Sequence, residues 1–200
     1  MAITANSPPY TYLDEAGEPR GSDVEIAKAA AAKMGRKLKV RAVDFDELIP
    51  LTKSGAVDMA ASGLSFTEGR HRSVDFSIPY AEDGGAFLYR VGEREPTMIS
   101  AGFIRVATIE AMTHDFYLTR HGVDPVRYHS FVDAIKDLEQ KKIDAMYFDK
   151  SSLVSVAEKS GGRLAVTPLV TRENLCIAVH KGFAELKAAL DAAIEERRAK

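Results

Sequence analysis

The chain alternates short apolar runs with longer stretches in which apolar residues recur every three or four positions. The short runs predict strands, and the longer stretches predict amphipathic helices. A regular alternation of this kind is typical of α/β folds with a largely parallel sheet. In chain order, the first elements expected are a strand at 2–5, a helix at 23–34, a strand at 38–43, a helix at 45–54 and a strand at 56–62.

Two residues mark the ends of the first expected helix. Asp23 has the short polar side chain of an N-cap residue, and Gly35 suits the left-handed conformation that ends many helices. The Pro- and Gly-rich segment 7–21 predicts a loop or a hairpin. We expect Tyr10 and Tyr12, inside this segment, to pack against the core.

A weak internal repeat suggests two similar α/β units instead of one continuous sheet. When the sequence is shifted by 86 positions, apolar residues fall on apolar residues with helical spacing. The same shift places Gly63 on Asp149, and each follows the carboxyl end of an expected strand, where open α/β sheets bind ligands. The matched pairs are Phe45 with Phe131, Ile49 with Ile135, Val57 with Ile143 and Asp58 with Asp144.

The repeat predicts two lobes joined by two crossings of the chain. We expect residues 1–89 and 179–200 to form the first lobe, and residues 90–178 to form the second. Each lobe should hold a mostly parallel sheet flanked by helices. A chain that crosses twice makes a two-strand hinge, which is suited to closing a cleft around a ligand.

Composition excludes several classes of function. The chain has 200 residues, 46% hydrophobic content and a net charge of −2, which is an ordinary globular profile. Nucleic acids and anionic membranes demand a basic surface, so we expect neither as a partner. No apolar run approaches the roughly 18 residues of a membrane span. The single Cys176 excludes an internal disulfide and a cysteine-based metal site.

The segment Ser62–Tyr80 carries the residues with candidate binding chemistry. Arg70 offers a planar fork of donors that matches a carboxylate. Ser65 and Thr67 supply hydroxyl and backbone N–H groups, and Gly63 allows a ligand to approach the backbone closely. A helix that begins near Thr67 would direct its N-terminal dipole toward an anion.

An ordinary surface loop explains the same residues. In that interpretation Thr67 is only an N-cap residue. The arginines of the segment, Arg70 and Arg72, would then pair with Glu68 or Asp75 at the surface. Judged locally, the two interpretations stay open.

The same segment resembles a known family. The runs "GLSFTEGR" and "VDFSIPY" resemble the signature of the bacterial extracytoplasmic solute-binding proteins of family 3, which deliver amino acids to ABC importers. Four further pieces are similar to that family in the same order, so the resemblance covers most of the chain from about Ile3. These pieces are "PPYTYLDEAGEPRGSDVEIAKA", "VDFDELIPLTKSGAVDMAAS", "KKIDAMYFD" and "LCIAVHKG".

The resemblance implies a two-lobe, Venus-flytrap periplasmic-binding-protein architecture with a small amino acid or related carboxylate in its cleft. A guanidinium from one lobe and a carboxylate from the other would hold the two ends of a zwitterion. The family pattern places Arg70 on the α-carboxylate with help from Ser65 and Thr67, Gly63 and Asp149 on the amine, and Phe45 as a wall for the ligand side chain. Taken alone, Asp149 suits an N-cap of the next helix equally well.

The sequence departs from the family pattern at three places. The second-lobe loop that usually carries Gly-Thr reads Ala111-Met112-Thr113, so only Thr113 is a candidate contact there. Ser7 stands where an aromatic side chain usually stacks on the ligand. The chain ends at "EERRAK", short of the terminal segment of most members, which suggests an excised or divergent domain.

Other functions are weighed against binding. The sequence has no G-x-S-x-G elbow, glycine-rich phosphate loop or H-E-x-x-H, and we expect no catalysis, cofactor or metal. A sensor domain of a membrane receptor or lytic enzyme is the main alternative, and an enzyme similar to cyclohexadienyl dehydratase is a weaker one. The five histidines lack metal spacing and are expected to be solvated or capping: His71, His114, His121, His129 and His180.

The resemblance also implies a setting and partners. We expect a monomer that works in the periplasm or another extracytoplasmic space and meets the membrane subunits of an ABC importer. The chain opens "MAITANSPPY" without a basic and apolar leader, so we expect no signal peptide within this sequence.

Overall fold

A computed structural model describes residues 1–199 of the chain. They form two compact units, one made of Met1–Glu82 with the segment from Glu173 onward, and one made of Asp83–Arg172. The sequence pattern placed these boundaries after residues 89 and 178. The chain passes from one unit to the other twice, and the strands at these crossings, β8 (Ala81–Asp83) and β14 (Glu173–Leu175), pair with each other.

The first unit is built on a five-stranded sheet in the order β5-β1-β6-β15-β7. Strand β1 runs parallel to β5 and β6, and β15 runs antiparallel to β6 and β7, so four of the five strands point the same way. A small antiparallel sheet of β2, β3 and β4 lies beside the start of α1. The elements of the first unit are β1 Ala2–Ile3, β2 Asn6–Ser7, β3 Thr11–Leu13, β4 Pro19–Arg20, α1 Ser22–Lys33, β5 Arg41–Ala42, a 3-10 turn Phe45–Glu47, α2 Leu48–Ser54, β6 Met59–Ala60, α3 Glu68–His71, β7 Asp75–Phe76, β15 Ala178–Val179 and α8 Ala184–Arg198.

The second unit repeats this topology. Its sheet has the order β11-β10-β12-β9-β13, with β10 parallel to β11 and β12, and β9 antiparallel to β12 and β13. One reversed strand again stands fourth among five. Its elements are β9 Gly85–Arg90, α4 Met98–Ala101, β10 Val106–Ile109, α5 Thr113–Arg120, β11 Val126–Tyr128, α6 Phe131–Glu139, β12 Ala145–Asp149, α7 Lys150–Lys159 and β13 Leu164–Val166.

The shared topology explains the repeat in the sequence. Strand β6 begins at Met59 and β12 begins at Ala145, which are separated by the same 86 positions as the matched residues. Both strands hold the third position in their sheets. The repeat therefore reflects two units with one topology.

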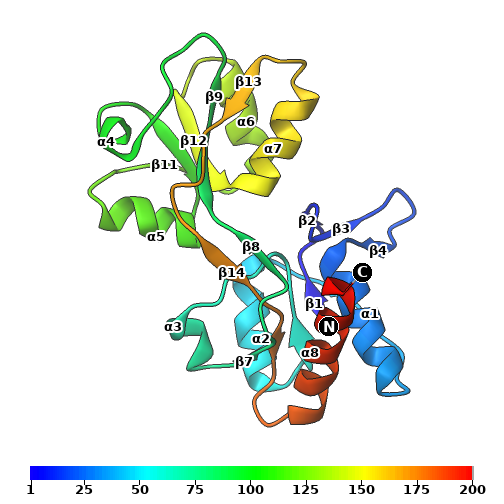
Figure 1. The fold of residues 1–200 in the computed structure, drawn as a ribbon. Coiled ribbons are helices and arrows are strands. Elements are labelled where there is room, and N and C mark those ends of the chain that lie inside the picture. The colour runs from blue at the N-terminus through cyan, green and yellow to red at the C-terminus, as the bar shows by residue number, and fades with distance from the viewer. Residues whose placement is uncertain (200) are drawn as a thin grey trace. The chain divides into compact units, whose positions relative to one another are not determined.

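Each sheet is covered by helices on both faces, because side chains of consecutive strand residues point to opposite faces. In the first unit, Ile3 and Met59 pack with α1 and α8, which lie side by side in Figure 1. The neighbouring Ala2 and Ala60 pack with α2 on the opposite face. A fully buried side chain of the size of Ile3 contributes about 1.5–3 kcal/mol.

Strand β12 shows the same alternation in the second unit. Met146 and Phe148 join the core under α6 and α7, whereas Ala145 and Tyr147 join the core under α4 and α5. Tyr147 is fully buried, and its ring lies 4.8 Å from that of Phe87. Because β12 is buried on both faces, its residues form a continuous apolar run in the sequence.

Two local expectations are wrong. Helix α1 begins at Ser22 with Gly21 as its N-cap residue, so Asp23 lies inside the first turn, fully buried. Its carboxylate is used in a long-range contact described below. Tyr10 is buried as expected, but Tyr12 is 36% exposed, because it lies on the face of β3 opposite to that of the fully buried Thr11.

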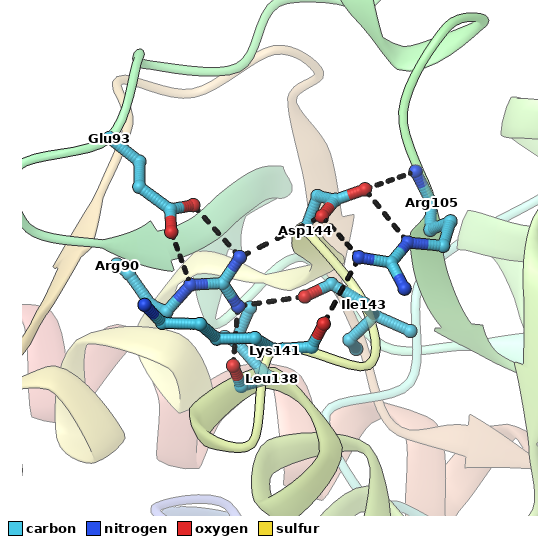
Figure 2. A network of polar contacts seen from close by, with 7 residues as sticks. All are labelled: Arg90, Glu93, Arg105, Leu138, Lys141, Ile143 and Asp144. Carbon is cyan, nitrogen blue, oxygen red and sulfur yellow. Dashed lines mark hydrogen bonds and ion pairs between the residues drawn. The ribbon is translucent and has the colours of Figure 1, made fainter.

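A network of charged side chains joins the start of β12 to the strands beside it (Figure 2). Arg105 binds both oxygens of Asp144, with Nη2 2.7 Å from Oδ1 and Nε 3.1 Å from Oδ2. Arg90 binds both oxygens of Glu93 at 2.7 and 2.8 Å and donates to the Ile143 carbonyl at 2.7 Å. Asp144 is therefore structural, as its place in an apolar strand suggests.

Among residues 1–199, the helices are all too short or too polar to cross a membrane.

The Asp144 carboxylate should stabilise the second unit at neutral pH. The hydrogen bonds from Arg105 lower the pKa of Asp144 below its usual value. The stabilisation is therefore complete above the unfolded pKa of about 3.9 and is lost as the pH falls through the folded pKa. We expect Asp144→Asn to lower the free energy of unfolding at pH 7 by about 1–2 kcal/mol, because charge-assisted hydrogen bonds are lost. Urea denaturation measures the change.

Asp133→Asn is the matched control. Asp133 lies 3.2 Å from Lys136, and both side chains are 61% exposed. A surface pair of this kind is worth about 0.5 kcal/mol. Equal effects of the two substitutions would contradict the structural role of the Asp144 network.

Candidate functional site

In the first unit, the segment that follows β6 gathers four of the expected site residues. Thr67 is the N-cap residue of α3, and its hydroxyl accepts from the Arg70 backbone N–H at 3.2 Å. The Arg70 guanidinium donates to the Ser65 carbonyl at 3.0 Å and lies 5.5 Å from the centre of the Phe45 ring. The capping role expected for Thr67 and the clustering expected for a binding site are thus both present.

Gly63 sits in a turn that requires glycine. Its φ is +61°, a left-handed conformation that glycine adopts without strain. A Cβ atom at this position would lie 2.5 Å from the Tyr10 ring, which is too close for any side chain. The backbone N–H of Gly63 donates to Asp23 Oδ2 at 3.0 Å. The fold therefore fixes this glycine independently of any ligand.

Asp23 anchors that turn from α1. It is fully buried, and its second carboxylate oxygen accepts from the Ser22 hydroxyl at 3.1 Å. Burial raises the pKa of Asp23 to about 6, although the hydrogen bond from Gly63 acts in the opposite direction. The protein thus keeps an acid in its core at a cost in stability whenever the pH is above that value.

Hydroxyl groups surround the start of the same segment. The buried Ser62 hydroxyl accepts from the Thr4 backbone N–H at 2.8 Å and lies 2.7 Å from the Thr11 hydroxyl. Ser7, which replaces an aromatic residue of the family pattern, lies 2.7 Å from the Thr4 hydroxyl. Ser7 is therefore part of a local hydroxyl cluster.

Sequence reasoning missed Glu173. The segment around Ser65 pairs with β14, since Phe66 N–H donates to the Asn174 carbonyl at 2.8 Å and Ser65 bridges Leu175. This pairing brings the Glu173 carboxylate against the Ser65 hydroxyl, which donates to it. The residues lie 108 positions apart, and nothing in the local sequence of either segment indicates the contact.

In the second unit, Asp149 ends β12 and is the residue matched with Gly63 by the 86-position shift. It is the residue before α7, but its side chain makes no capping hydrogen bond there. Asp83 takes that place, accepting from the Ser151 hydroxyl at 2.5 Å. The Asp149 side chain keeps 18% exposure. The interpretation of Asp149 as a helix cap is therefore wrong.

His114 is the partner of Asp149, and the expectation that it is solvated or capping is wrong. The residue is only 2% exposed, and Nε2 lies 3.3 Å from Asp149 Oδ1. Its ring packs against those of Tyr147 and Phe148, with centroids 5.6 and 5.0 Å away. The sequence around His114 does not distinguish a buried histidine from a solvated one, because either can occur in the first turn of an amphipathic helix.

Thr113, the other candidate in this unit, is the first residue of α5 and precedes His114 directly. The loop before it is strained, because Ala111 has φ +61° where the family pattern has glycine. Left-handed backbone costs a non-glycine residue about 1–2 kcal/mol. Asp115 supports the loop by accepting from the Ala111 N–H at 3.2 Å, and Arg127 in turn holds Asp115 at 3.1 Å.

Comparisons with known proteins agree with one another along the whole chain. The model of the bacterial extracellular solute-binding proteins, family 3, matches residues 1–200. The L-arginine-binding protein of Pseudomonas aeruginosa is 32% identical over 100% of this chain and 82% of its own length. An ancestral arginine-binding protein bound to glutamine has a TM-score of 0.87 and 28% identity over 100% of this chain and 91% of its own. The membrane-bound lytic murein transglycosylase F of Ectopseudomonas mendocina is 31% identical over 76% of this chain and 33% of its own length.

The buried Asp23 generates a testable consequence for stability. A raised folded pKa means that the acid stabilises the fold most below the unfolded value of about 3.9, and that this contribution is lost as the pH rises through about 6. The loss amounts to about 3 kcal/mol. We expect Asp23→Asn to unfold at higher urea than the wild type at pH 7.5, with the difference shrinking toward pH 4.

Glu25→Gln serves as the control for this measurement. Glu25 lies on the same helix, is 56% exposed and pairs with Lys28 at the surface. It should leave the pH dependence of unfolding unchanged. An Asp23→Asn protein whose stability differs from that of the wild type by the same amount at both pH values would contradict the raised pKa of Asp23.

Proposed function

Since the chain belongs to the bacterial extracellular solute-binding proteins, family 3, we propose that it binds a free amino acid or a closely related small carboxylate for import by an ABC transporter. The proposal includes no chemical step. It rests on two groups of opposite charge, one in each unit, that match the two ends of a zwitterion.

The Arg70 cluster carries the proposal. The guanidinium is held by the Ser65 carbonyl and by the Phe45 ring, so it is oriented before any ligand arrives. A fixed planar fork binds a carboxylate through two parallel hydrogen bonds at little cost in side-chain entropy. We propose that Arg70 binds the ligand carboxylate, that Thr67 and Gly63 add backbone contacts, and that Phe45 borders the ligand side chain.

Asp149 supplies the opposite charge. Its carboxylate is partly exposed and is not used to cap α7. We propose that it binds the ligand ammonium and that Thr113 of the same unit is a further ligand contact. Ligand binding to the folded protein should raise its stability by mass action.

Ser65 has a more limited role in this proposal. Its hydroxyl proton is directed to Glu173, so that hydroxyl must turn before it can donate to a ligand. Glu173 adds a negative charge beside the proposed carboxylate site. A carboxylate at this place favours ligands that carry a positively charged side chain in addition to the zwitterion.

In a second candidate function, the chain binds the same kind of ligand but works with a different partner. The match to part of a lytic transglycosylase favours a ligand-binding module within a larger protein. In the importer proposal the chain works as a monomer in the periplasm and presents its ligand to transporter membrane subunits. Reconstitution with the membrane subunits of an amino-acid ABC importer separates the two: ligand-dependent stimulation of ATP hydrolysis supports import, whereas intact binding without stimulation supports the module.

Ligand binding should raise thermal stability by mass action. A ligand at 100 times its Kd adds about 2.7 kcal/mol to the free energy of unfolding, which corresponds to a shift of several degrees in Tm. We expect at least one of the twenty amino acids at 1 mM, most readily L-arginine, to give such a shift. A complete screen without any shift would contradict the proposed function.

The role of Arg70 is tested by calorimetric titration of the amino acid that gives the largest shift. Arg70→Ala should weaken binding by about 30-fold or more, because the desolvated ligand carboxylate loses its partner. Arg72→Ala is the matched control, since Arg72 is an exposed arginine of the same segment. If the two variants bind the amino acid with similar affinity, Arg70 is not part of the binding site.

A further inference from the structure

His114 and Asp149 form a buried pair at the one edge of the second sheet where the strand β12 ends. The imidazole is 2% exposed, whereas the carboxylate keeps 18% exposure, so the histidine lies behind the acid. Nε2 of His114 and Oδ1 of Asp149 are 3.3 Å apart. The Asp149 carboxylate, at 18% exposure, is thus partly accessible to a group that approaches from solvent.

The pair has two charge states with opposite consequences for a cation. Neutral imidazole leaves the negative charge of Asp149 intact. Imidazolium places a positive charge 3.3 Å from Oδ1 and offsets the charge of the carboxylate. Imidazole titrates near pH 6.5 when unperturbed, within the range in which an amino acid keeps both its ammonium and its carboxylate charged.

The Asp149 carboxylate lies 3.3 Å from the His114 ring, and the elements around that ring carry further charged side chains. Strand β12 contributes the rings of Tyr147 and Phe148 in addition to Asp149. On the same helix, Asp115 is engaged by Arg127 at 3.1 Å. Lys150, which follows Asp149, begins α7, and Asp83 is engaged by Ser151.

We propose that His114 is a positioning residue that makes ligand affinity depend on pH. In its neutral form it leaves the charge of Asp149 to the ligand ammonium, and in its protonated form it competes with that ammonium for the carboxylate. The proposal rests on the proposed function, since it assigns Asp149 to the ammonium. It follows that the protein binds its ligand tightly near neutral pH and weakly in acid.

The test is calorimetric titration with L-arginine, or with the amino acid that gives the largest thermal shift, between pH 5.0 and 8.5. If only the neutral form of His114 supports binding, the apparent Kd rises by up to about tenfold for each pH unit below the titration midpoint. His114→Gln keeps a donor but cannot be protonated. We expect it to stay within about threefold of the wild-type Kd at pH 7.5 and to show a flat profile down to pH 5.

His129→Gln is the control, because His129 is an exposed histidine of the same unit that pairs with Glu110 at 3.1 Å. It should keep the wild-type profile. A wild-type Kd that does not change with pH, or a His114→Gln profile that keeps the wild-type slope, would overturn the inference while leaving the proposed function intact. Absence of binding at every pH would instead overturn the proposed function.

A second measurement does not depend on a ligand. The His114 ring is followed by NMR through a pH titration in the wild type and in Asp149→Asn. Loss of the adjacent carboxylate should move the titration midpoint of His114 down by about one pH unit or more. An unchanged midpoint would show that the two side chains are not coupled, and would overturn the inference even if His114→Gln failed to fold.

Discussion

The structure depends on one topological constraint: parallel strands end at the same edge of a sheet, and the loops at that edge carry the chemistry. Strands β6 and β12 occupy the same position in two sheets of identical order. The first delivers Gly63 and the segment that leads to Arg70, and the second delivers Asp149. The core of each unit, built from alternating strand residues and flanking helices, fixes these ends. The proposed ligand contacts are consequences of where two equivalent strands stop.

In each unit, buried polar side chains support the segment that carries the charged group proposed to bind the ligand. In the first unit, the ionised Asp23 anchors the Gly63 turn, although burial raises its pKa to about 6. In the second, His114 lies against Asp149 and strain is stored at Ala111 in the preceding loop. Buried titratable groups and left-handed non-glycine residues both cost stability, and such features concentrate where function requires a fixed geometry. Their presence behind both groups is consistent with a binding role for each.

Much of the fold was readable from the sequence. The strand and helix alternation gave the α/β class, and the repeat gave two units of one topology, because apolar periodicity reflects local packing. Asp23 and His114 were misjudged for one reason: whether a polar side chain caps a helix, is buried or faces solvent depends on residues far away in the chain. Glu173 was missed for the same reason, since strand pairing across 108 positions sets its contact with Ser65. The roles of Arg70 and Asp149 came from the family resemblance and stay predictions.

The most direct test of the account compares three ligands that differ only at the two charged ends. L-Arginine carries both groups, agmatine lacks the carboxylate, and 5-guanidinopentanoic acid lacks the ammonium. Calorimetric titration at pH 7.5 should give measurable binding for L-arginine and a loss of about 30-fold or more for each of the other two, because each leaves one buried charge of the protein without its partner. If either one-ended ligand binds as tightly as the amino acid, recognition of a zwitterion by opposite charges in the two units is wrong.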